Sequence, residues 1–157
     1  MKISNKNKLI IALLSILYIV CGFFREFIFL NINEQSRIAY YHDADSHLAA
    51  SMKWLEGFSY NTLYYSKWPL TLLFTILFTF IASRIIKLWF ADKMLVKITW
   101  MAYGITFATG LLFYLAGSLS GHRETTYDIA RFLAGLTETP AMLVMLLASF
   151  MALRRLR

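Results

Sequence analysis

The chain has 157 residues, of which 59% are hydrophobic and 17% aromatic, and its formal net charge is +7. This apolar content exceeds that of soluble domains, which need a polar surface, and it indicates a protein that lies in a bilayer. No tract of Lys and Arg interleaved with polar residues suggests a nucleic-acid-binding face, so we expect no nucleic-acid partner. The single cysteine, Cys21, excludes an intrachain disulfide and a cysteine-rich metal cluster.

The first apolar stretch follows three lysines and has the form of a signal peptide. We do not expect cleavage, because Val20 stands where processing before Cys21 would need a small residue, and because the apolar run continues through Phe24. With the residues up to Leu30, the run is long enough to cross ~30 Å of hydrocarbon. We therefore predict an uncleaved first span at about 9–30.

Three further apolar stretches are long enough to be spans, at about 69–90, 95–116 and 129–153. Pro69 would open the first of them, since a proline lacks the N–H that the first helical turn leaves unpaired. Pro140 disfavours helical geometry at Thr139, so we expect a break within the last span. The pattern predicts an all-α, four-span transmembrane helix bundle that forms a single integral membrane domain over residues 1–157.

The segment between the first two spans, residues 31–68, is the longest polar part of the chain. Apolar residues at i, i+4 and i+7 predict a short amphipathic helix there, capped by Asp43 or Asp45 and ending at Gly57. These apolar residues are Leu48, Met52 and Leu55. We expect this helix to lie at the bilayer interface, and the aromatic residues that follow it are typical of that region.

The distribution of basic residues predicts the orientation of the bundle. Both termini and the turn between the second and third spans carry ten Lys and Arg residues and a single acid, Asp92. We expect the spans to cross the inner (plasma) membrane. Because Lys and Arg collect in cytoplasmic loops, both termini should lie in the cytoplasm and the loops at 31–68 and 117–128 on the outer side. All three histidines and eight of the nine acids then lie toward the outer side.

The first outer loop holds two of the three histidines beside two aspartates. Imidazole and carboxylate groups together can act as a general base or can bind zinc, manganese or iron. The candidate catalytic residues are His42, Asp43, Asp45 and His47, with His122 from the second loop. Their spacing matches no metal-binding motif, so a metal cofactor is one hypothesis and a polar surface with a helix cap is the other.

Helical rise places two charges at a similar depth. Arg25 lies 17 residues after the last N-terminal lysine and Glu138 lies 16 residues before the C-terminal arginines, or ~25 Å and ~24 Å along a helix. An unpaired charge there costs at least ~2.5 kcal/mol, so we hypothesise that Arg25 pairs with Glu138. Glu26 would then face Lys67 or Arg131. The alternative is that Arg25 and Glu26 extend separately to the interface.

The charged residues near the outer side form a candidate ligand-binding or ion-pair group. Arginine side chains in such a group suit a phosphate or a carboxylate, which they bind through paired N–H donors. Its members are Arg25, Glu26, Arg123, Asp128, Arg131 and Glu138.

The segment from Asp43 and Asp45 through Leu55-Glu56-Gly57-Phe58-Ser59-Tyr60 resembles the first outer loop of polytopic glycosyltransferases that use lipid-linked sugars. In that family an acidic residue of this loop is the base or a metal ligand, and the resemblance implies such a role for Asp43 or Asp45. The likeness covers this segment alone. Those enzymes also have many more spans than four.

Three functions are compatible with the sequence. The first is an accessory membrane protein whose outward polar residues bind a ligand, a partner membrane protein or a second copy of the chain. The second is a membrane enzyme that acts on a lipid or lipid-linked substrate through the histidines and aspartates. The third is a small ion or solute transporter that uses Arg25 and Glu138 at the break in the fourth span.

Overall fold

The computed structural model describes residues 4–42, 47–120 and 123–155, and this part of the chain forms helices and no strand. The elements in chain order are α1 (Asn5–Tyr41), the 3₁₀ helix η1 (Ala50–Gly57), α2 (Tyr60–Phe90), α3 (Lys93–Ser120), α4 (Arg123–Thr137) and α5 (Pro140–Arg155). Helices α1, α2 and α3 are long and apolar enough to cross a membrane, and α4 with α5 makes a fourth span if the bent pair is counted as one. The predicted all-α class is confirmed for these residues.

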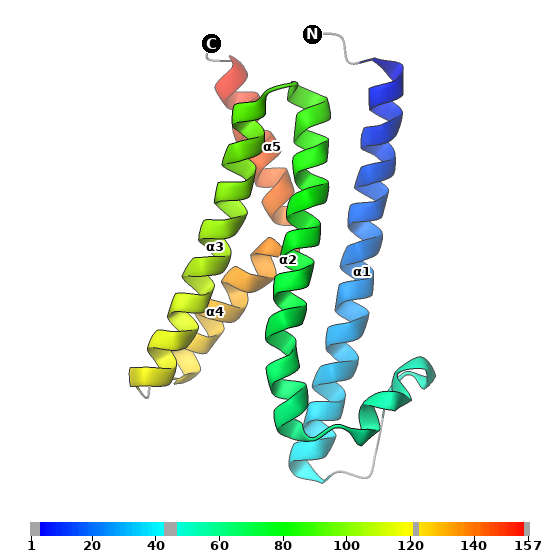
Figure 1. The fold of residues 1–157 in the computed structure, drawn as a ribbon, viewed down its shortest axis with the longest axis vertical. Coiled ribbons are helices and arrows are strands. Elements are labelled where there is room, and N and C mark those ends of the chain that lie inside the picture. The colour runs from blue at the N-terminus through cyan, green and yellow to red at the C-terminus, as the bar shows by residue number, and fades with distance from the viewer. Residues whose placement is uncertain (1–3, 43–46, 121–122, 156–157) are drawn as a thin grey trace.

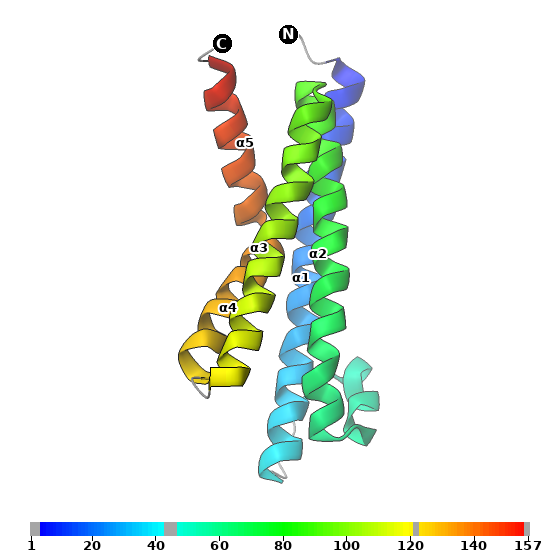
Figure 2. The same cartoon turned by 60° about the vertical axis from the view of Figure 1, so that its left-hand side comes forward.

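The long helices lie side by side around α2, with α1 along one side and α3 along the other (Figures 1 and 2). Helix α4 packs against the lower half of α3, and α5 then runs upward, so that the two ends of the chain lie at the same end of the molecule. In both views the lower ends of α1 and α4 diverge.

Helix α2 is the centre of the hydrophobic core. In its most apolar stretch 56% of the residues are buried, against 11% in α1 and 17% in α3. The core side chains include Phe74, Phe78, Ile81, Ile85 and Ile86 of α2, Tyr18 of α1, Tyr103 of α3 and Phe150 of α5. The outer faces of α1 and α3 keep large apolar side chains exposed, which is unfavourable in water and suits contact with lipid. This distribution indicates a membrane protein.

Both α1 and α2 are longer than the apolar stretches that predicted them. Helix α1 continues through the polar residues after Leu30 and ends at His42, which has a left-handed conformation with φ 55°. Helix α2 begins after Ser59, whose hydroxyl accepts a hydrogen bond from the backbone N–H of Thr62. Pro69 therefore lies inside α2, and its predicted place in the first turn is wrong. An interior proline removes one backbone hydrogen bond, and a long helix that packs against neighbours on both sides tolerates this loss.

The predicted short helix is present as η1 and ends at Gly57, as expected. Its N-cap is Ala49, which makes no side-chain cap hydrogen bond, so the predicted capping by Asp43 or Asp45 is wrong. The helix begins too late in the chain for those residues, which lie outside the described part. Met52 and Leu55 of η1 pack with apolar side chains of α1 and α2, so the apolar face of η1 is covered by protein.

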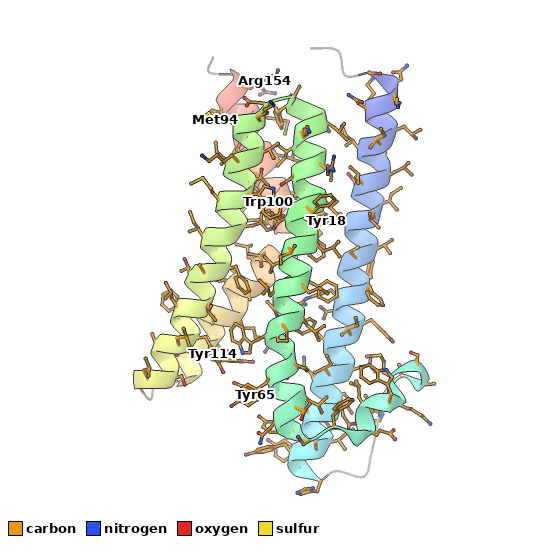
Figure 3. The ribbon with its side chains drawn as sticks, in the orientation of Figure 1. Tyr18, Tyr65, Met94, Trp100, Tyr114 and Arg154 are labelled. Atoms are coloured by element: carbon orange, nitrogen blue, oxygen red, sulfur yellow. The ribbon has the colours of Figure 1, made fainter. Side chains whose placement is uncertain are left out.

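The predicted break before Pro140 is confirmed, since α4 and α5 meet at a bend of 66°. Polar side chains of three other helices surround it. The hydroxyl of Tyr18 donates to the carbonyl oxygen of Thr139 at 3.2 Å and lies 2.9 Å from the hydroxyl of Tyr103. Figure 3 labels Tyr18 where α1 approaches α2. The hydroxyls of Thr75 and Thr137 are 3.0 Å apart. These hydrogen bonds serve backbone and side-chain groups that a break would otherwise leave without partners.

Close packing of α3 on α4 depends on two glycines of α3. A Cβ atom built on Gly110 would lie 3.3 Å from both the carbonyl oxygen of Ala130 and the Cβ of Leu133. A Cβ atom on Gly117 would overlap the side chain of Thr126. Small residues at such positions allow helix backbones to approach, as is common between membrane helices.

Candidate functional site

A cavity of about 600 Å³ lies between α1, α2 and α4, beside the break that precedes α5. It occupies the part of the molecule in which α1 and α4 diverge in Figures 1 and 2. Five charged side chains line it, namely Arg25, Glu26, Lys67, Arg131 and Glu138. Four of these five belong to the predicted ligand-binding or ion-pair group, so the fold brings together residues from both ends of the sequence.

The hypothesised pairing of Arg25 with Glu138 is present. The guanidinium donates to Oε2 of Glu138 from Nε at 2.8 Å, and its Nη2 lies 2.6 Å from the same oxygen. The side chain of Glu138 is 0% exposed and that of Arg25 is 20% exposed. The guanidinium also lies 4.4 Å from the ring centroid of Phe29. This pair joins α1 to the break between α4 and α5.

Glu26 does not pair with Lys67 or Arg131, and that expectation is wrong. Its Oε2 lies 3.0 Å from Nη1 of Arg25, the neighbouring residue, and its side chain is 57% exposed. The guanidinium of Arg25 therefore contacts two carboxylates, one fully buried and one open to the cavity. If both carboxylates are ionised, these three residues carry one net negative charge.

The other two charges of the cavity are Lys67 on α2 and Arg131 on α4. Lys67 is half-buried and Arg131 is exposed. Within the part of the chain that the structure describes, neither forms an ion pair with a carboxylate. The Nζ of Lys67 lies 6.0 Å from the ring centroid of Tyr64. These two side chains therefore bring two positive charges to the cavity without a paired acid among the described residues.

A second groove of about 620 Å³ adjoins this cavity and shares Tyr64, Lys67 and Tyr127 with it. The rings of Trp68 and Tyr114 are 4.4 Å apart between centroids, and the hydroxyls of Tyr64 and Tyr114 are 3.4 Å apart. Tyr127 of α4 lies next to Tyr114, with ring centroids 6.5 Å apart. Figure 3 shows Tyr114 on the lower part of α3, in the half of the molecule that holds both hollows. Most of these aromatic groups have polar atoms that a ligand could contact.

The proposed catalytic group is tested only in part. His42 is exposed at the end of α1, and His47 is exposed after it, with its backbone N–H 3.4 Å from Oε1 of Glu34. Neither histidine lines the cavity. Asp43, Asp45 and His122 lie outside the described residues, so the convergence of these five side chains stays a prediction.

The other predicted members of the polar group lie on α4. Asp128 is exposed and does not line the cavity, and Arg123 begins the helix. The side chain of Arg123 is outside what the structure describes. Among the described residues, no group of three or more His, Cys, Asp or Glu side chains is placed to hold a metal ion. The metal hypothesis therefore depends on the residues that are not described.

Sequence reasoning missed several residues of α2 that line the cavity. Tyr64, Trp68 and Thr71 recur at helical spacing on the same face as Lys67. This spacing would have predicted a polar face if α2 had been started at Tyr60. The aromatic residues were instead interpreted as an interfacial segment that precedes the helix.

Compared with protein-family models, with curated proteins and with solved structures, the chain shows no significant match in any of the three.

Proposed function

We propose that this chain is a multi-pass inner-membrane protein that binds a ligand with a phosphate or carboxylate group in the cavity between α1, α2 and α4. Both termini would lie in the cytoplasm, η1 near the outer interface, and the cavity at the depth of the outer leaflet. The single observation that carries the proposal is the placement of Lys67 and Arg131 on this cavity without an acidic partner among the described residues.

The physical argument concerns the cost of charge in an apolar environment. A charged side chain at membrane depth costs at least ~2.5 kcal/mol unless it reaches water, headgroups or a partner. Lys67 of α2 and Arg131 of α4 repel each other across the cavity that both line, and a bound anion removes this repulsion. Arg131 offers paired N–H donors and Lys67 offers a compact charge, a combination suited to the oxygens of a phosphate or a carboxylate.

The cavity is also suitable in size and lining. A volume of about 600 Å³ lies within the usual range for small-molecule sites. Trp68 and Phe29 supply apolar surface, and Asn33 and Tyr127 supply polar groups. This mixture favours an amphiphile or a small organic anion over an inorganic ion alone.

We propose that this protein binds its ligand in support of another membrane protein and does not transform the ligand itself. A small bundle that holds a lipid or an organic anion can present it to a partner in the same membrane. The enzyme hypothesis depends on Asp43, Asp45 and His122, and the transporter hypothesis depends on movement at the break, so both stay predictions.

The test is ligand binding by the purified protein in detergent. Native mass spectrometry would measure retention of phosphatidylglycerol, phosphatidylethanolamine and a fatty acid by the wild type, Lys67→Gln and Arg131→Gln. Loss of one charge-assisted contact should weaken binding of at least one of these ligands about tenfold. Lys53→Gln, a change of an exposed lysine on η1, is the matched control and should bind like the wild type. Equal binding by all four proteins would contradict the proposal.

A further inference from the structure

The five charged side chains of the cavity fall into two groups, one around Arg25 and one made of Lys67 and Arg131. Arg25 contacts Glu138 through Nε and Nη2 and contacts Glu26 through Nη1, so its three nitrogens all face carboxylates. With two carboxylates and one guanidinium, this group is net negative if both acids are ionised. Lys67 and Arg131, which lie near each other on the same cavity, form a second group that is positive.

The negative group retains capacity to accept hydrogen bonds. A carboxylate offers about four lone-pair sites. The side chain of Glu26 is 57% exposed on the cavity and contacts Arg25 through Oε2. In the buried carboxylate of Glu138, both bonds from Arg25 end on Oε2. Oε1 has no partner at hydrogen-bond distance among the residues that the structure describes, and the hydroxyl of Thr71 lies near the same carboxylate. A ligand that carried only negative charge would be attracted by Lys67 and Arg131 and repelled by the carboxylates of Glu26 and Glu138.

We propose that the ligand of this cavity is a zwitterion, an aminoalkyl phosphate whose phosphate binds Lys67 and Arg131 and whose ammonium binds Glu26. This inference rests on the proposed function and adds the chemical class of the ligand. The ammonium donates its N–H groups to the exposed carboxylate of Glu26. The headgroup of phosphatidylethanolamine and free phosphoethanolamine share this chemistry.

The apolar lining of the cavity favours phosphatidylethanolamine over free phosphoethanolamine. The cavity lies between α1, α2 and α4, and apolar side chains of α1 and α4 line it, including Leu30 and Ala134. An acyl chain attached to the phosphate can leave the cavity along such a surface without crossing a polar region. The lipid form therefore gains contacts that the free headgroup does not make.

The experiment compares ligands that differ only in the headgroup. The full chain, purified in detergent, is titrated with phosphatidylethanolamine and phosphatidylglycerol of identical acyl chains, with free phosphoethanolamine and with glycerol phosphate. Apparent Kd values come from native mass spectrometry or tryptophan fluorescence. Phosphatidylethanolamine should bind about tenfold more tightly than phosphatidylglycerol, the effect of one charge-assisted hydrogen bond. Free phosphoethanolamine should bind more weakly than the lipid, and equal affinity would make the soluble compound the ligand.

The variants locate the preference. Glu26→Gln should bring the affinity ratio of the two lipids close to one, whereas Glu56→Gln, an exposed acid of η1, should leave the ratio unchanged. A preference that persists in Glu26→Gln would overturn the assignment of the ammonium to this site. If phosphatidylglycerol binds the wild type as tightly as phosphatidylethanolamine while Lys67→Gln weakens both, the zwitterion is wrong and the anion site stands. If no ligand responds to Lys67→Gln or Arg131→Gln, the anion site itself is wrong.

Discussion

Arg25 and Glu138 are 113 residues apart in the chain, yet Nη2 of the arginine lies 2.6 Å from Oε2 of the glutamate. The pair matters for the fold because α1 is otherwise held mainly by α2. It also fixes the position of the cavity, since Arg25 and Glu138 both line it. One interaction therefore links the stability of the bundle to the arrangement of the candidate site.

Loss of either partner should destabilise the protein. Arg25→Gln leaves the buried charge of Glu138 uncompensated, which costs about 3–5 kcal/mol. Glu138→Gln should cost less, because Arg25 keeps its contact with the carboxylate of Glu26. The double exchange Arg25→Glu with Glu138→Arg restores opposite charges and should recover at least half of the loss. Unfolding by titration with sodium dodecyl sulfate measures the free energies, and Glu56→Gln is the control because Glu56 is exposed. A double variant no more stable than the single variants would show that the pair does not stabilise the fold.

The hydroxyl of Tyr18 should stabilise the folded protein by its hydrogen bonds at the break between α4 and α5. Tyr18→Phe removes the hydrogen bond to the carbonyl of Thr139 and the contact with Tyr103, and it should cost about 1–2 kcal/mol of unfolding free energy. Tyr65→Phe deletes the same atom from a side chain that is 63% exposed and should have no effect within error. The same unfolding titration compares them, and equal stabilities would contradict the proposed support of the break.

Gly117 should not tolerate a larger side chain. In Gly117→Ala the new methyl group overlaps the side chain of Thr126, so α3 and α4 must separate, at a cost of about 1–3 kcal/mol. Gly22→Ala places the same methyl group in open space and should be neutral or slightly stabilising, because alanine favours helix. Thermal unfolding in detergent distinguishes the two variants. If both unfold at the wild-type temperature, the close packing of α3 on α4 is wrong.

The predicted orientation can be tested by labelling cysteines from one side of the membrane. In a Cys21→Ala background, Gly57→Cys should react with a membrane-impermeant maleimide added to intact cells, because residue 57 would lie outside. Lys93→Cys, at the exposed first residue of α3, should react only after the cells are opened. The reverse pattern would invert the topology and place the cavity in the inner leaflet.

Some features of the fold could be predicted from single residues with strong local effects. Pro140 restricts the residue before it, and this restriction alone located the break. The pairing of Arg25 with Glu138 was predictable because helical rise converts residue number into depth, and unpaired charges at depth are costly. These arguments need no knowledge of how helices rotate or pack.

Other features depend on tertiary packing. The start of α2 at Tyr60 was missed because its first residues are polar and aromatic, and Pro69 resembled a helix start more strongly than Ser59 did. The partner of Glu26 depends on the rotation of α1 about its axis and on competition from the neighbouring Arg25. Depth in the membrane determines neither the start of α2 nor the partner of Glu26. The residues that line the cavity could therefore be identified only from the structure.

At the bend of 66° between α4 and α5, the peptide backbone itself produces an electric field. Peptide dipoles give a helix a partial positive charge at its first residues and a partial negative charge at its last. In a straight helix these partial charges cancel along the interior, but at a bend two helix ends are left facing different directions. Their field acts on the carboxylate of Glu138, which lies between the two ends. Because the backbone produces this field, we expect it to persist in Glu138→Gln and to keep the interior polar there.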